Sequence, residues 1–182
     1  RIVDEAQKLR KYSIPSNMDY LEDMYDPETG TSATAFRNKD TGEIILAYTG
    51  TNFQSEFLKD GAVDVTEVVT AGEEHYKPAF EFYERVRAKY GNNIVLTGHS
   101  LGGNIAQRVA LEYNVQKTVV YNSAPLYVFE VSELHKFGTL DPMKVERAVK
   151  EQERIEELEK NYTGETIRIR SESDPVSGVG GK

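Results

Sequence analysis

Hydrophobic and polar positions along this chain change period several times, and each period predicts an element. Apolar side chains are frequent in residues 34–37 and 43–48, and the turn-forming run 38–42 between them predicts a β-hairpin. Within residues 76–90, large apolar side chains recur every three or four positions, and Gly91 ends the pattern. The pattern in the first half of the chain therefore predicts a β-hairpin followed by an amphipathic helix.

The same periods continue in the second half of the chain. Residues 94–97 predict a strand, residues 105–113 a helix, residues 118–121 a second strand and residues 166–170 a third. Strands that alternate with helices imply a parallel sheet whose faces the helices cover. The predicted fold class is α/β, with a mostly parallel sheet, covering helices and a helical insertion at about 126–163.

The insertion contains the most charged helix of the chain, predicted over 143–160. Its apolar stripe is thin and consists of Val145, Val149, Ile155 and Leu158. One interpretation is a solvated helix that crosses the surface, and the other is a cap over a site at this edge of the sheet. A shorter amphipathic helix is predicted within 1–13, with Ile2, Ala6 and Leu9 on one side.

A catalytic motif stands between the strand at 94–97 and the helix at 105–113. Residues 98–103 read Gly-His-Ser-Leu-Gly-Gly, which contains the Gly-x-Ser-x-Gly nucleophile elbow. A serine at such a bend is lifted clear of the backbone, beside free N–H groups. Gly98 and Gly102 are expected because the bend brings neighbouring chain too close for a side chain. Ser100 is the candidate nucleophile, and an ordinary glycine-rich turn is the alternative.

Two oxyanion donors are expected beside Ser100. In hydrolases with a nucleophile elbow, one donor is the N–H of the residue after the serine, here Leu101, and the other comes from a loop after an earlier strand. Here Gly50 and Thr51 follow the strand at 43–48, so Thr51 is the second candidate. A simple turn at the strand end is the alternative.

A serine nucleophile of this kind works in a triad with an acid and a histidine base. The acid is predicted at Asp174, and the histidine is missing from residues 1–182. Asp174 follows the last predicted strand and precedes Pro175, which fixes the loop, although Asp-Pro is also a common turn. The template order is serine, acid, histidine, and no histidine follows Asp174. Of the three histidines present, His75 is expected to cap or pack, and His99 to point away from the reacting face and pack or hydrogen-bond beneath the bend, while His135 lies in the insertion.

Composition narrows the function classes. The chain has 182 residues, expected to form one domain (1–182), and its first and last residues suggest a fragment of a longer chain. A net charge of −8 argues against a nucleic-acid partner. The absence of cysteine excludes disulfides and thiolate metal sites. We expect no cofactor and no metal ion.

Taken together, these motifs resemble those of the class 3 lipases, the α/β-hydrolase group that includes the fungal triglyceride lipases. The elbow matches fully; Tyr48-Thr49-Gly50-Thr51 is similar to the family's oxyanion segment, and Ser173-Asp174-Pro175-Val176 to its aspartate loop. Asp64 resembles an acid of the family, and residues 74–80 resemble its helix start, which supports a structural His75. Thr49 replaces the family's arginine, and the C-terminal histidine is absent.

The resemblance implies an α/β-hydrolase fold and hydrolysis of lipid esters by Ser100, Asp174 and a histidine beyond Lys182. Phospholipids, glycerides and small esters all remain open as substrates, and the expected partners are a lipid or ester, a membrane surface and a protein bound through the rest of the parent chain. The alternatives are an inactive lipase-like binding module and an acyltransferase or thioesterase on the same fold. An acidic lipase fragment without cysteine suits an exported bacterial protein, such as a toxin that acts on membranes, better than a cytoplasmic one.

Overall fold

The computed structural model describes residues 14–50, 72–126 and 141–171. Its described strands are β1 (Met18–Tyr25), β2 (Ser32–Asn38), β3 (Ile44–Thr49), β4 (Ile94–His99), β5 (Lys117–Tyr121) and β6 (Glu165–Ile169). Its described helices are α4 (Glu73–Tyr90), α5 (Leu101–Tyr113) and α7 (Pro142–Asn161). The predicted strands and these three helices are therefore confirmed to within a few residues, and the helix expected within 1–13 lies outside the described residues.

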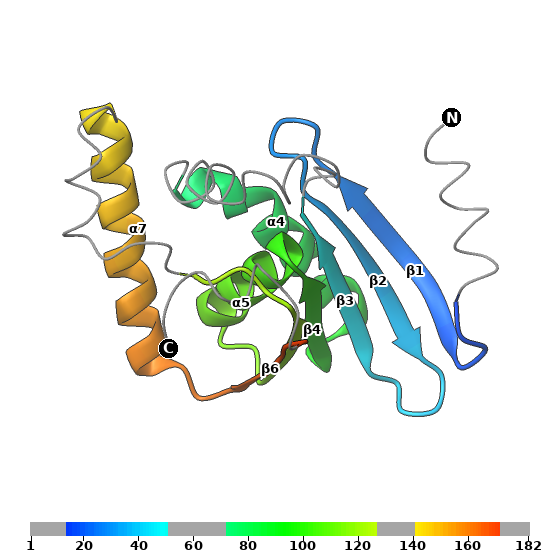
Figure 1. Cartoon of the computed structure of the whole chain (residues 1–182). Coiled ribbons are helices and arrows are strands. Elements are labelled where there is room, and N and C mark those ends of the chain that lie inside the picture. Colours follow the sequence, from blue (N-terminus) through cyan, green and yellow to red (C-terminus); the bar gives the residue numbers. More distant parts are fainter. Residues whose placement is uncertain (1–13, 51–71, 127–140, 172–182) are drawn as a thin grey trace.

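The six strands form one sheet in the order β1-β2-β3-β4-β5-β6. The pairs β1–β2 and β2–β3 are antiparallel, and β3–β4, β4–β5 and β5–β6 are parallel. Figure 1 shows the hairpin strands on one side of the molecule and α7 on the other, with α4 and α5 between them. The mostly parallel α/β sheet with covering helices is confirmed, with an antiparallel edge added by β1 and β2.

The strand β1 was not predicted. It contains Asp19, Glu22 and Asp23, and its side chains alternate poorly between buried and exposed because a bulge interrupts the pairing between Tyr20 and Glu22. A strand at the edge of a sheet can carry charged side chains and can lack a regular row of buried side chains. Tertiary contacts also hold it, since Glu22 accepts hydrogen bonds from Arg85, Lys89 and Tyr90 of α4 at 2.8, 2.9 and 3.0 Å.

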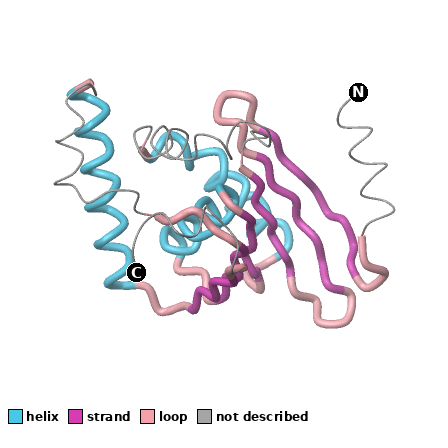
Figure 2. Tube along the Cα trace, viewed as in Figure 1, coloured by secondary structure: helices cyan, strands magenta, loops and turns pink. Residues whose placement is uncertain are grey.

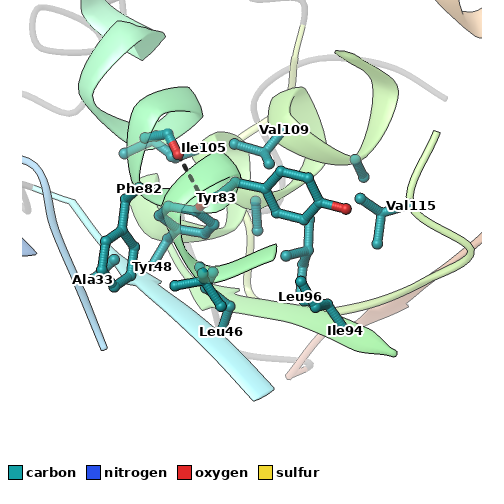
Figure 3. Packing of buried hydrophobic residues seen from close by; sticks show 14 of the residues in the cluster. Ala33, Leu46, Tyr48, Phe82, Tyr83, Ile94, Leu96, Ile105, Val109 and Val115 are labelled. Carbon is teal, nitrogen blue, oxygen red and sulfur yellow. Dashed lines mark hydrogen bonds between the residues drawn. The ribbon is translucent and has the colours of Figure 1, made fainter. Parts of the chain in front are cut away.

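The hydrophobic core lies between the sheet and the two central helices. Alternate residues of β2, β3 and β4 are buried, which is the period of a strand with one covered face. In Figure 3, Leu46, Tyr48 and Leu96 of the sheet face Phe82 and Tyr83 of α4 and Ile105 and Val109 of α5. The Tyr48 hydroxyl donates to the Ala79 carbonyl at 2.9 Å, so this buried phenol is paired. This packing fixes both helices on the sheet, and Figure 2 shows the helices in cyan beside the strands in magenta.

Helix α7 packs on α5 through a narrow face and is otherwise mostly exposed, as expected of a solvated helix on the surface. Asp141 caps its first turn, where its carboxylate accepts from the Met143 N–H at 3.0 Å. Its buried residues are Ala148, Glu151 and Ile155, so the stripe predicted from Val145, Val149, Ile155 and Leu158 is only partly right. The charged residue Glu151 belongs to the buried face because it pairs with a buried cation. Residues 127–140 of the predicted insertion lie outside the described residues.

That cation is Arg108 of α5, whose side chain is completely buried. Its Nε donates to Glu151 at 2.5 Å, and its Nη1 donates to Glu112 at 2.8 Å. The guanidinium also lies 5.1 Å from the ring centre of Phe80 and 5.7 Å from that of Tyr76. Burial raises the pKa of Glu151, and the neighbouring Arg108 opposes that shift. A buried ion pair of this kind fixes α7 at one position along α5.

We expect Arg108→Leu to lower the free energy of unfolding by about 3–5 kcal/mol, because it leaves Glu151 buried without a counter-charge. The double variant Arg108→Leu/Glu151→Leu should recover most of that loss, since both desolvated charges are then gone. Chemical denaturation measures both values. Lys150→Ala is the matched control: the Glu146–Lys150 pair is 67–71% exposed, and its loss should change nothing measurable. A double variant no more stable than Arg108→Leu alone would contradict this account.

Candidate active site

Ser100 is the single residue between β4 and α5. Its backbone has φ 55° and ψ −122°, in the left-handed region that residues with a side chain rarely occupy. Such a conformation costs about 1–3 kcal/mol and persists only where the surroundings impose it. The side chain is half-buried. The strand–bend–helix setting predicted for this serine is therefore present.

Backbone hydrogen bonds hold the bend on both sides. The Ser100 N–H donates to the carbonyl of Tyr121, at the end of β5, over 3.1 Å. The Ser100 carbonyl accepts from the N–H groups of Gly103 and Ala124, each at 3.0 Å. The bend is thus tied to α5, to β5 and to the loop that follows β5.

The glycines around Ser100 are required by close backbone packing. A Cβ on Gly98 would lie against the carbonyl of Gly102, and a Cβ on Gly102 would lie against the carbonyl of Tyr48, both well inside contact distance. The structure therefore confirms that a side chain at either position would clash with the backbone. Because no side chain separates β3, β4 and α5 here, Ser100 can emerge at the ends of the parallel strands.

Leu101 stands where the template needs an oxyanion donor. It is the first residue of α5, and the first N–H groups of a helix have no carbonyl partner within it. A Cβ on Gly50 would lie 2.5 Å from the Cβ of Leu101, so the end of the β3 segment touches the start of α5. Gly50 directly precedes Thr51 in the sequence. Thr51 itself, Asp64 and Asp174 lie outside the described residues.

The histidines differ from one another in their surroundings. His75 is 8% exposed and packs edge-on against Tyr76, with ring centres 5.5 Å apart, while Gly72 stands at the N-cap. Packing rather than capping is therefore its role in the structure. His99 is exposed at the end of β4, so it does not pack beneath the bend, which was one of the two roles expected for it. His135 lies outside the described residues.

His75 should make the protein less stable in mild acid. Burial lowers the pKa of His75, and Asp26 acts in the opposite direction. The unfolded chain, with a histidine pKa of about 6.5, then binds more protons than the folded chain. Stability should fall as the pH drops from about 6.5 to the folded-state pKa, by at most about 1.4 kcal/mol per pH unit. His75→Leu should remove this part of the pH dependence in urea denaturation between pH 5 and 7.5; identical slopes in the two proteins would contradict it.

Three polar side chains of α5 are buried, which the sequence analysis missed. They are Asn104, Gln107 and Arg108, each at most 3% exposed. Their spacing of three and four residues on a helix otherwise read as apolar was the available signal. Gln107 donates to Ser123 at 2.7 Å and accepts from Arg168 of β6 at 2.9 Å. The elbow helix is thereby connected to the last described strand.

Neither a metal centre nor a membrane span is found in the described part of the chain. Within residues 14–50, 72–126 and 141–171, no three histidine, cysteine or carboxylate side chains gather closely enough to hold a metal ion. None of the described helices is both long and apolar enough to cross a bilayer.

A mostly parallel sheet that carries a serine on a strained strand-to-helix bend defines an α/β-hydrolase domain. The profile of the phospholipase-like family described as "Tle-like phospholipase domain" matches residues 5–150. The chain belongs to this family, and the lipase-like α/β-hydrolase fold expected from the motifs is confirmed. No curated protein sequence matches the chain.

Solved structures of fungal lipases resemble the chain more distantly. The lipase of Rhizopus microsporus var. chinensis shares 15% identity at a TM-score of 0.45, over 68% of this chain and 51% of the lipase. Lip2 lipase of Yarrowia lipolytica shares 17% identity at a TM-score of 0.43, over 59% of this chain and 47% of the lipase. The chain thus spans about half the length of the solved lipases that it matches.

Proposed function

We propose that this domain hydrolyses carboxylic esters of lipids, with phospholipids as the substrate class. The observation that carries the proposal is Ser100, held at a positive φ directly before the N-terminal end of α5. An attacking serine must stand clear of the backbone, and N–H groups at the start of a helix can stabilise the negative charge that forms on the carbonyl oxygen. Membership of a phospholipase-like family supports the choice of substrate.

In the proposed reaction, Ser100 Oγ attacks the ester carbonyl carbon while a histidine takes the hydroxyl proton. The carbonyl oxygen becomes negative and is stabilised by the N–H groups of Leu101 and Thr51. The same histidine gives the proton to the departing alcohol, and water then releases the fatty acid from the acyl-serine. Asp174 orients the histidine and stabilises its charged form.

The general base that takes the proton of Ser100 is the third member of the proposed triad. Packing buries His75 against Tyr76, and no histidine follows Asp174 within the chain. We therefore assign the base to a histidine beyond residue 182. We also place the protein outside the cell that makes it, at a membrane surface, in keeping with its acidic, cysteine-free composition.

A fluorophosphonate probe tests the proposal in the full-length protein. We expect covalent labelling of Ser100, located by mass spectrometry of the peptide, together with release of fatty acid from phosphatidylcholine vesicles. Trioctanoin and p-nitrophenyl butyrate, assayed beside the vesicles, separate a phospholipase from a glyceride lipase or a small-ester esterase. Full-length protein that neither reacts with the probe nor releases fatty acid would leave the inactive binding module as the better description.

A further inference from the structure

The buried amide of Asn104 has a cost that packing alone does not explain. Asn104 is fully buried, in the first turn of α5 and four residues after Ser100. Taking an amide out of water costs free energy unless each polar group finds a partner. An apolar side chain would fill a helix–helix contact more cheaply, so the contacts that this amide makes define its role.

Both ends of the Asn104 amide are paired, and each partner lies on a different segment. The Tyr76 hydroxyl of α4 donates to Oδ1 at 2.7 Å, and Nδ2 donates to the carbonyl of Pro125 at 2.8 Å. A carbonyl can only accept, so Nδ2 must face Pro125, which leaves Oδ1 to face Tyr76. The amide therefore has one orientation, in which it joins α4 to the loop after β5.

That loop also holds the nucleophile's backbone. Ala124, which directly precedes Pro125, donates its N–H to the Ser100 carbonyl at 3.0 Å, and the Asn104 N–H reaches the same oxygen at 3.3 Å. The strained conformation of Ser100 thus depends on a loop whose next residue is fixed by the Asn104 side chain. Without that link, Ala124 has more freedom to leave the Ser100 carbonyl.

We propose that Asn104, held between Tyr76 and Pro125, is a positioning residue that holds the hydroxyl of Ser100 at the attack position. The proposal rests on the function proposed above. The side chain of Asn104 bonds to Tyr76 and Pro125, so it acts through Pro125 and Ala124 on the serine backbone. Displacements of about 1 Å at a reacting atom lower rates by about 100-fold.

Two small substitutions test this role in the full-length protein. Tyr76→Phe removes only the hydroxyl that donates to Oδ1, and Asn104→Asp, when ionised, keeps an acceptor for Tyr76 but loses the donor to Pro125. We expect each to lower kcat for p-nitrophenyl butyrate by about 10- to 100-fold, with KM within about twofold of wild type. The rate of fluorophosphonate labelling should fall by the same factor. In the Asn104→Asp background, Tyr76→Phe should have no further effect, because both act through one amide.

The matched control is Tyr162→Phe. It removes a phenol hydroxyl that donates to a backbone carbonyl, that of Val115, at 2.7 Å, beside the start of β5 and away from Ser100. We expect this variant to keep the wild-type kcat even if its melting temperature falls as far as that of Tyr76→Phe. A loss of kcat in Tyr162→Phe equal to that in Tyr76→Phe would overturn the proposal, because general loosening would then explain both.

The remaining outcomes separate the two proposals. Wild-type labelling rates in both Tyr76→Phe and Asn104→Asp would overturn the role of Asn104 and leave Ser100 as the nucleophile. Wild-type protein that is not labelled at all would overturn the proposed function, and the positioning role with it.

Discussion

Ser100→Ala in the full-length protein should lower kcat by about 10⁴- to 10⁶-fold while KM stays near that of the wild type. The loss is large because the hydroxyl forms the covalent bond, and no other nucleophile stands at the bend. The substrate's acyl and head groups do not depend on this oxygen for binding, so KM should change little. Initial rates on phospholipid vesicles and on p-nitrophenyl butyrate measure both parameters. A loss of less than tenfold would show that Ser100 is not the nucleophile.

Ser100→Gly separates the chemistry from the conformation of the bend. Alanine keeps the unfavourable φ of 55°, so Ser100→Ala should be about as stable as the wild type. Glycine occupies that region at no steric cost, so Ser100→Gly should unfold with a free energy higher by about 1 kcal/mol or more. Both variants should be inactive. Equal stability of the two would contradict the strain inferred for this residue.

Gly102→Ala should destabilise the domain by about 3 kcal/mol or more, enough to prevent folding of a marginal protein. Helix propensity alone predicts the opposite, because alanine is better than glycine in a helix by about 1 kcal/mol. The added Cβ, however, would press on the Tyr48 carbonyl of β3, and neither backbone can move without breaking the packing of α5 on the sheet. Thermal and urea unfolding, with soluble yield, measure the effect.

The control for this substitution is Gly42→Ala, in the turn before β3. Gly42 has a φ of 74° but no atom within 4 Å of an added Cβ. We therefore expect a loss of only about 1–2 kcal/mol, from backbone strain alone. If Gly102→Ala were no more harmful than Gly42→Ala, the close approach of α5 to β3 would not be a requirement of this fold.

Local patterns predicted most of the elements and the place of Ser100. The helix at 73–90 and the strand at 94–99 follow from side-chain period and from Gly91, which act within a few residues. The elbow was predictable for the same reason, since the serine and its glycines are neighbours in the sequence. The acidic strand β1 was not predicted, because its place depends on pairing with β2 and on cations of α4.

Short-range periodicity and backbone freedom at particular glycines were therefore enough to predict the α/β class, the order of the elements from β2 onward and the residue at the bend. The contact of Arg108 with Glu151, 43 residues away, and the link that Asn104 makes between Tyr76 and Pro125 became visible only in the folded chain. A buried polar side chain is stable only with a partner, and no local pattern states which distant residue the folded chain will bring to it.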